Sequence, residues 1–496
     1  MRYISVFMFF CFSIQVNCQS EKKQNSQLLT LERAISIATD SSLSAFRAKN
    51  LYLSGYWQFR TFKAERLPSA SLDMTPFSYN QNFTKRYDYT NNVDVYKSQQ
   101  SLNSYANLSI KQNVDLTGGT FFIDTELGYF QDFGQTKYEQ YSSVPFRIGY
   151  SQSLFGYNSF KWEKKIEPLK YEKVKKELLY NIEEIAEQTS DYFFNLALYQ
   201  TLYNLAKQNV ANSDTLYKIG MERYKIGTIS QSELLTLKLD VINAQNNIGN
   251  AELNLKKSTF NLAAFLHFDN QINFNINIPE NTLNVILDSR DAVRLAKENN
   301  PTYLEQKENI LTAQQNLDQT IKASRFSASL SASVGFNQVA TDFVDAYNKP
   351  LQQDVVAVGL NVPIVDWGVR KGKVNIAKRN LEVINISAKQ TEQTFEQDVL
   401  STVSEYNLRH SQIKLTKEAK DIAKQAFEKT KQLFFIGKVD VNTVNLAVSR
   451  QIEAESNYVS ALKNYWLCYY KIRKLTLFDF VERKPITMKL EEISGY

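Results

Sequence analysis

Cysteine and histidine are scarce in this sequence. Its 496 residues include three cysteines and two histidines. Cys11 and Cys18 lie in the N-terminal segment and Cys468 stands alone, so we expect no disulfide to stabilise the chain. His267 and His410 have no second metal-binding residue at helical spacing, and we interpret both as solitary surface residues. The sequence therefore predicts no metal site.

Motifs that hold nucleotides or activate a nucleophile are also absent. The sequence contains no GxSxG, GxxxxGK[ST] or GxGxxG pattern. Carboxylate pairs such as Glu183 and Glu184 do occur, but they lie on long polar helical stretches, where a solvated face is expected. The sequence therefore predicts a protein that is not an enzyme and that needs no cofactor.

Long apolar runs and a strong excess of one charge are missing as well. The chain carries 58 basic and 52 acidic residues, a formal net charge of +6, and the two signs are interleaved along the helical stretches. This pattern predicts a solvated surface and no nucleic-acid partner. Beyond the N-terminal segment no run of about eighteen apolar residues occurs, so no transmembrane helix is expected. Entry into a membrane would then require a closed β-barrel.

The N-terminal segment has the three parts of a secretory signal peptide, which we assign to residues 1–18. A basic start, Met1–Tyr3, precedes the apolar stretch Ile4–Ile14, which is too short to span a bilayer, and a polar end follows. Cys18 has two interpretations: the residue before the cleavage point, or the lipid-accepting cysteine of a lipoprotein. The first is favoured, because "QVNC" lacks the small apolar residues of a lipobox.

The chain is an internal tandem repeat. The matching pairs are Leu29–Ser42 with Leu287–Asn300, Ser69–Leu72 with Ser327–Leu330, Gln152–Lys165 with Val362–Asn375, and Gly227 with Gly437. The first two pairs are offset by 258 residues and the last two by 210, so the first copy carries 258 minus 210, or 48, extra residues between Leu72 and Gln152. We assign residues 19–286 to the first repeat, 287–480 to the second and 481–496 to a C-terminal tail.

Very long helices are predicted in both copies. Val369 to Phe434 contains no proline and one glycine, and its 66 positions would extend about 99 Å as a helix. Apolar residues recur in a narrow stripe along these helical stretches, as at Ile242, Ile248 and Leu253, which is typical of coiled-coil rods with one face on a partner helix. In the first copy Pro168 predicts a kink or a helix start, so the rod is expected to begin after it.

Six segments alternate apolar with polar residues over about ten positions, the period and length of outer-membrane strands. Four fall in the first repeat and two in the second: residues 69–80, 105–116, 120–131, 145–155, 327–340 and 354–365. Asp115–Gly119 predicts a tight turn, and the polar stretch 80–105 predicts a long loop. Six strands seldom close a barrel, so either several chains share one barrel or the strands form another structure.

Several segments, in the same order in both copies, resemble the TolC-like outer membrane channel proteins of Gram-negative efflux pumps and type I secretion systems. They are "DAVRLAKENNP", "LNVPIVDWGVRKGKV", "RYKIGTISQSELL", "GKVDVNTVNLA" and "ALKNYWLCYYKIRKLTLFDF". The similarity extends from Leu29 to Phe480, and the closing segment together with "DWG" resembles Bacteroidetes members.

The resemblance implies an α+β membrane protein, in which a long α-helical coiled-coil periplasmic barrel joins a transmembrane β-barrel shared between three chains. It further implies a passive exit duct in the outer membrane with a long periplasmic extension. A homotrimer would contact outer membrane lipid and receive substrates from an inner-membrane pump through a periplasmic adaptor protein. Six strands per chain would give eighteen, against the usual twelve, so the extra hairpin either widens the barrel or projects from its rim.

The resemblance also implies that Gly227 and Gly437 mark two helix-hairpin tips at which the adaptor docks. The predicted docking residues are Arg223, Tyr224, Gly227, Thr228, Ile229, Phe434, Phe435, Gly437, Lys438 and Val439. Family members carry an acidic gate just beyond the second tip, where this chain has Thr443, and Glu233 and Asp440 are the nearby acidic candidates. An aspartate that caps a helix start is the commoner explanation for Asp440.

One alternative from a different class stays open. A secreted structural or adhesive protein could carry a β head on a coiled-coil stalk without entering a membrane.

Overall fold

The computed structural model describes residues 26–134, 137–268, 273–280, 282–283 and 285–490. The predicted signal peptide and Cys18 lie outside these residues. The chain divides into two compact units. Of the described residues, one unit contains those up to Leu43 together with Gln188–Thr282 and Ser411–Asn464, and the other contains Ser44–Glu187, Leu283–His410 and the residues from Tyr465 onward.

The elements follow one order twice along the chain. The helices are α1 (Leu31–Ser41), α2 (Leu43–Ala64), α3 (Ser159–Lys225), α4 (Gln231–Phe265), α5 (Ser289–Asn299), α6 (Pro301–Ala323), α7 (Val369–Phe435) and α8 (Val441–Thr476). The strands and the 3₁₀ turn are β1 (Ser26–Thr30), β2 (Ser69–Asp88), β3 (Val93–Val114), β4 (Gly119–Asp132), β5 (Tyr138–Leu154), β6 (Asn273–Asn277), β7 (Ser327–Ala340), η1 (Asp345–Tyr347), β8 (Leu351–Asn361), β9 (Phe478–Asp479) and β10 (Lys484–Pro485).

Equivalent residues of the two copies begin the short helices. Thr30 accepts a hydrogen bond from the amide of Arg33 at the start of α1, and Asp288, 258 positions later, accepts from two amides at the start of α5. Pro301 occupies the first turn of α6, where its missing amide costs little. Local capping chemistry is therefore repeated with the sequence.

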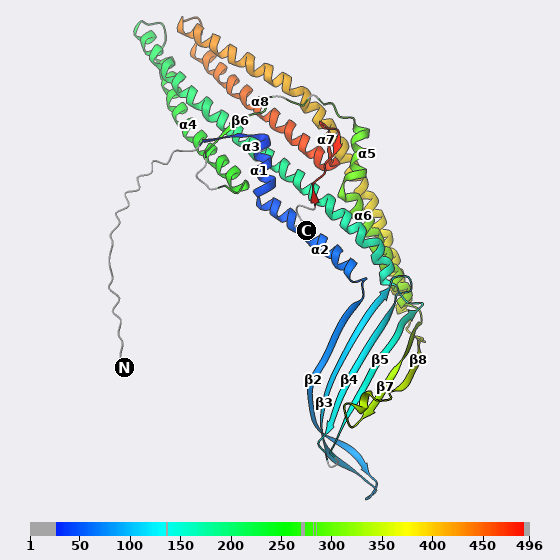
Figure 1. Cartoon of the computed structure of the whole chain (residues 1–496). Coiled ribbons are helices and arrows are strands. Elements are labelled where there is room, and N and C mark those ends of the chain that lie inside the picture. The colour runs from blue at the N-terminus through cyan, green and yellow to red at the C-terminus, as the bar shows by residue number, and fades with distance from the viewer. Residues whose placement is uncertain (1–25, 135–136, 269–272, 281, 284, 491–496) are drawn as a thin grey trace, which may run out of the picture. The chain divides into compact units, whose positions relative to one another are not determined.

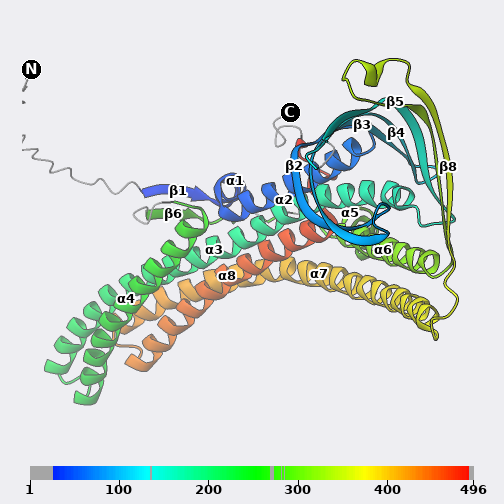
Figure 2. The same cartoon turned by 90° about the horizontal axis from the view of Figure 1, so that it is seen from below.

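The sheet of the second unit contains six strands in the order β2-β3-β4-β5-β7-β8, and all its neighbouring strands are antiparallel (Figure 1). The strands curve in an arc from β2 to β8 (Figure 2). Because β3 and β4 pair on both sides, the residues added in the first copy form an integral part of the sheet. The outer edges of β2 and β8 pair with no strand among the described residues.

The two faces of this sheet differ in chemistry. Residues opposite each other on antiparallel strands point to the same face, and Ile110, Ile123, Ile148 and Val334 are paired in one exposed apolar row. The next row, on the other face, contains Ser109, Asp124 and Arg147, and the Arg147 guanidinium donates to both carboxylate oxygens of Asp124. The period-two pattern of the sequence thus becomes one apolar and one polar face.

Two sequence-based expectations about this unit are wrong. Residues 80–105 are mostly not a loop. Strand β2 extends to Asp88, β3 begins at Val93, and only a four-residue turn separates them. Most side chains of this ribbon are exposed, so its many polar residues remain hydrated while its backbone is paired. The long helix α3 begins at Ser159 and contains Pro168 within it. Pro168 lies on the exposed side, where water can replace the hydrogen bond that its missing amide would have made.

A buried ion pair joins α3 to α8 in the second unit. The Arg473 guanidinium donates to both carboxylate oxygens of Glu183, each at 2.9 Å, and also to Asp479. Burial opposes the charge of Arg473, but the hydrogen bonds and the charge of Glu183 outweigh it and raise the Arg473 pKa. Glu183 is only 4 % exposed, which corrects the expectation of a solvated face.

The first unit contains a short parallel pair that the sequence did not indicate. Strands β1 and β6 pair over five residues, with Leu29 and Phe274 buried. Strands this short carry too few positions for a recognisable period. Among the described residues, none of the helices has the length and hydropathy that a membrane crossing requires.

We predict that Glu183→Ala destabilises the protein by about 3 kcal/mol, because it leaves the Arg473 charge buried without its main partner. Denaturant unfolding in detergent micelles measures this loss. Glu184→Ala, one residue along the same helix, is the matched control and should change the free energy of unfolding by less than about 1 kcal/mol. Equal effects of the two substitutions would contradict the assignment.

Candidate functional site

The first hairpin tip lies between α3 and α4. The amide of Gly227 donates to the carbonyl of Tyr224 at 3.0 Å, and that of Thr228 donates to the carbonyl of Arg223 at 2.9 Å. This pair of bonds is a Schellman motif, which requires a left-handed residue after the helix, and Gly227 supplies it with φ of +76°. Ser230 then begins α4 by accepting a hydrogen bond from the Glu233 amide.

The second tip, between α7 and α8, has the same geometry. The amides of Gly437 and Lys438 donate to the carbonyls of Phe434 and Leu433 at 3.0 and 2.9 Å, and Gly437 has φ of +75°. Asp440 begins α8 by accepting hydrogen bonds from the amide and the hydroxyl of Thr443. The repeat in sequence therefore gives one turn geometry twice.

The three candidate gate residues, Glu233, Asp440 and Thr443, all take part in helix capping. The amide and hydroxyl of Ser230 donate to the Glu233 carboxylate and lower its pKa. The hydroxyl and amide of Thr443 likewise lower the pKa of Asp440. Both carboxylates are therefore ionised at neutral pH and hold the first turns of α4 and α8.

The two tips pack against each other through one apolar core in the first unit, and both turns lie at the same end of their helices (Figure 1). The buried members are Leu216, Ile229, Leu237, Phe434, Val441 and Val444. Arg223 of the first tip adds a polar link to the second. Its guanidinium donates to the carbonyl of Phe434 at 3.4 Å and lies 5.2 Å from the centre of the Phe434 ring.

This core buries some of the residues that the sequence predicted as docking residues at the tips. Phe434 is only 1 % exposed and Ile229 is also buried, so these two predicted docking residues do not lie on the surface. Tyr224 and Phe435 are exposed, as are Thr228 and Lys438. The sequence reasoning missed Ile226 and Ile436, which are 74 % and 65 % exposed. The 210-residue offset could have found them, since each isoleucine directly precedes a turn glycine.

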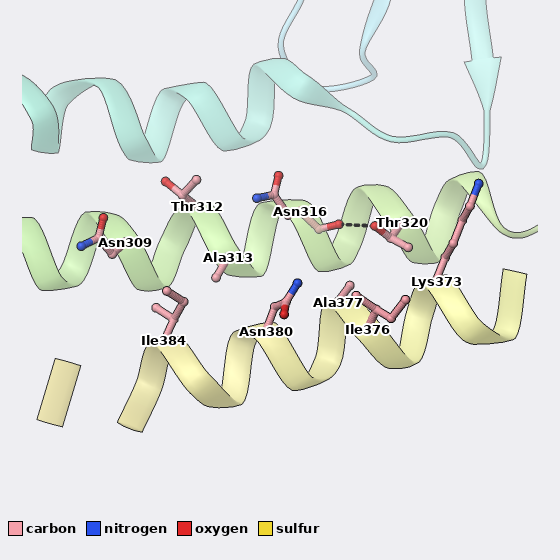
Figure 3. A pocket seen from close by; sticks show the side chains of 10 residues that line it. All are labelled: Asn309, Thr312, Ala313, Asn316, Thr320, Lys373, Ile376, Ala377, Asn380 and Ile384. Carbon is pink, nitrogen blue, oxygen red and sulfur yellow. Dashed lines mark hydrogen bonds between the residues drawn. The ribbon is translucent and has the colours of Figure 1, made fainter. Parts of the chain in front are cut away.

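The second unit contains an open groove of ≈ 480 Å³ between α6 and α7. Polar and apolar side chains line it, with Asn309 and Asn316 from α6 and Asn380 and Ile384 from α7 (Figure 3). Its only titratable lining residue is Lys373, so the groove has no acid–base pair for catalysis. Among the residues that the structure describes, no three His, Cys, Asp or Glu side chains are placed to hold a metal ion.

A family model described as outer membrane efflux protein matches residues 101–266 and 292–475, which is more than half of the chain. The chain belongs to the outer membrane efflux protein family. The two matched segments fall in the two copies of the repeat. No curated protein sequence matches the chain.

Solved channel structures share the fold of this efflux protein at low sequence identity. The Campylobacter jejuni CmeC outer membrane channel matches with a TM-score of 0.64 at 14% identity, covering 99% of this chain and 96% of that one. A Pseudomonas aeruginosa membrane protein matches with a TM-score of 0.64 at 13% identity, covering 90% of each chain. The open state of the Neisseria gonorrhoeae MtrE outer membrane channel matches with a TM-score of 0.59 at 13% identity, covering 90% of this chain and 88% of that one.

Family membership confirms the predicted function, an outer membrane efflux channel, and the prediction that the chain is not an enzyme. The alternative of a secreted adhesive protein finds no support.

Gly227→Ala is expected to destabilise the first tip by about 1 kcal/mol, because alanine is strained at φ of +76° although nothing within 4 Å would obstruct its methyl group. Gly249→Ala, inside α4 and equally unobstructed, is the matched control. It should have the opposite sign and stabilise the helix by up to about 1 kcal/mol. Denaturant unfolding of both variants measures the difference, and destabilisation by Gly249→Ala of the same size would refute the turn argument.

The capping carboxylates predict a pH dependence. A carboxylate with a lowered pKa stabilises the fold above its unfolded pKa, and this contribution is lost as the pH falls through the folded value. Below about pH 4, the first turns of α4 and α8 should therefore lose protection in hydrogen exchange. In Asp440→Asn, which still caps but does not titrate, the α8 turn should lose its pH dependence while the α4 turn keeps it.

Proposed function

We propose that three copies of this efflux protein form one passive exit duct, with a transmembrane β-barrel in the outer membrane and long helices in the periplasm. The observation that carries this proposal is the open sheet: β2 and β8 each leave an edge that another copy can pair. Three sheets of six strands would give eighteen, enough to close around a water-filled channel.

The chemistry of the two faces supports this arrangement. The row of Ile110, Ile123, Ile148 and Val334 would face lipid, and the row that contains Asp124 and Arg147 would face the aqueous interior. Lipid offers no partner for backbone amides, so edges inside the membrane must be paired. The integral position of β3 and β4 in the sheet favours a wider barrel over a hairpin projecting from the rim.

The hairpin tips would be the docking site for a periplasmic adaptor protein, which receives substrates from an inner-membrane pump. The support is the exposed pair Ile226 and Ile436, held outward by glycine turns over a shared core. Apolar side chains at the end of a rigid element are typical of surfaces that a partner covers. Both efflux and type I secretion would use the same site.

The test is the double variant Ile226→Ser with Ile436→Ser, expressed with its signal peptide in cells that carry an adaptor and pump of this class. We expect crosslinking to the adaptor and substrate export to fall at least tenfold, as for removal of about 1.4 kcal/mol of binding free energy. Outer-membrane fractionation and the native mass in detergent should still give three chains.

The control is Phe260→Ser, which removes an exposed apolar side chain from α4 away from the turn. It should leave crosslinking unchanged. A native mass of one or two chains for the unmodified protein would overturn the trimeric duct, whereas normal crosslinking of the double isoleucine variant would overturn only the docking site.

A further inference from the structure

Two connectors lead from strand to long helix in the second unit, and each holds an exposed aromatic residue in a left-handed backbone conformation. Phe155, between β5 and α3, has φ of 60° and is 73 % exposed. Trp367, between β8 and α7, has φ of 54° and is 96 % exposed. This conformation is unfavourable for a bulky residue, so the local structure must impose it.

Polar contacts fix both connectors. In the second, the Asp366 carboxylate accepts from the amides of Gly368 and Arg370, and the Arg370 guanidinium donates to the carbonyl of Pro363. In the first, the Asn158 side chain accepts from the amide of Lys161 at 3.1 Å and donates to the carbonyl of Asp115 at 2.9 Å. The apolar side chains at these connectors are therefore presented to solvent by a rigid backbone.

Basic residues follow each aromatic residue within six positions. The first thirteen residues of α7, Val369–Leu381, include five basic side chains and no acidic one. Lys371 and Lys378 lie seven positions apart, on the same side of the helix, and are exposed. At the start of α3, Lys161 and Lys164 are also exposed. Within the part of the chain that the structure describes, these four lysines have no carboxylate within 4.0 Å.

The charge at the opposite end of the sheet differs. Exposed aspartates lie beside the β2–β3 turn and in the β7–β8 connection, including Asp94, Asp342 and Asp345, and Lys85 there pairs with Asp94 at 2.8 Å. Among the described residues, lysines without an ion pair, such as Lys97 and Lys349, occur at this end too, but aspartates accompany them, whereas the first thirteen residues of α7 contain no acidic residue.

We propose that the two connectors bind anionic phospholipids of the membrane leaflet nearest the long helices. Phe155 and Trp367 lie at the level of the headgroups, and Lys161, Lys164, Lys371 and Lys378 contact the lipid phosphates. This inference rests on the membrane position proposed above. An acidic protein partner would match the lysines but not the fully exposed Trp367 and Ile364, whereas a bilayer offers phosphate directly above apolar chains.

The charge complementarity between the lysines and anionic lipid predicts a measurable binding preference. Each lysine near an anionic membrane surface contributes roughly a fivefold preference for anionic over neutral lipid at low salt. The preference is screened as ionic strength rises, because exposed charges interact over about one Debye length. Lys161 and Lys371 occupy equivalent positions of the repeat, so substituting both tests both connectors at once.

The experiment reconstitutes the mature full-length protein in phosphatidylcholine vesicles that contain brominated phosphatidylglycerol or, separately, brominated phosphatidylcholine. Quenching of tryptophan fluorescence gives the relative binding constant of the two lipids. We expect the unmodified protein to prefer phosphatidylglycerol. The double variant Lys161→Gln with Lys371→Gln should lower that preference by roughly fivefold at each connector. The control, Lys97→Gln with Lys349→Gln at the opposite end of the sheet, carries the same charge change and should retain it.

The aromatic part of the proposal has its own readout. Trp367→Phe should remove the largest share of the quenching while leaving vesicle insertion intact, because phenylalanine keeps the apolar contact. Unchanged quenching in that variant, or equal affinity of the inserted unmodified protein for both lipids, would overturn the connector proposal and leave the duct standing. Failure of the unmodified protein to co-float with either type of vesicle would overturn the duct and this inference with it.

Discussion

The unpaired backbone along β2 and β8 is the constraint on which the rest of this structure depends. One chain supplies six strands whose outer edges find no partner among the described residues. Edge amides and carbonyls that stay unpaired promote association, and in lipid they are not tolerated. The proposed trimer satisfies them by placing β8 of one copy against β2 of the next. The trimer would then form as part of folding, and not by association of monomers that have already folded completely.

The shared core of the tips sets a second limit on function. Phe434, Val441 and Val444 from one hairpin pack with Leu216 and Leu237 from the other. Each tip therefore supports its neighbour. At the turns themselves, Ile226 and Ile436 are the most exposed apolar side chains, directly before the two turn glycines. A docking site of this kind combines a rigid support with a small contact surface, and rigidity limits the entropy lost on binding.

The places where sequence reasoning failed have a common physical cause. The polar stretch 80–105 was predicted as a loop, yet its backbone is paired in β2 and β3. Glu183 was expected in solvent, yet it is buried in an ion pair with Arg473, 290 positions later in the chain. Phe434 was expected at the surface, yet the other hairpin covers it. Each outcome depends on a partner far away in the chain, which no local pattern reveals.

The tandem repeat, the long helices, the alternating segments that became the six strands and the two glycine turns could all be predicted from the amino-acid sequence. These features depend on local spacing: a 3.6-residue or two-residue period, a capping side chain, or a residue that tolerates positive φ. The strand order, the separation of apolar and polar faces and the exposure of the tip residues depend instead on the three-dimensional fold. Those properties are set by contacts between segments up to several hundred residues apart, and the burial of each side chain follows from them.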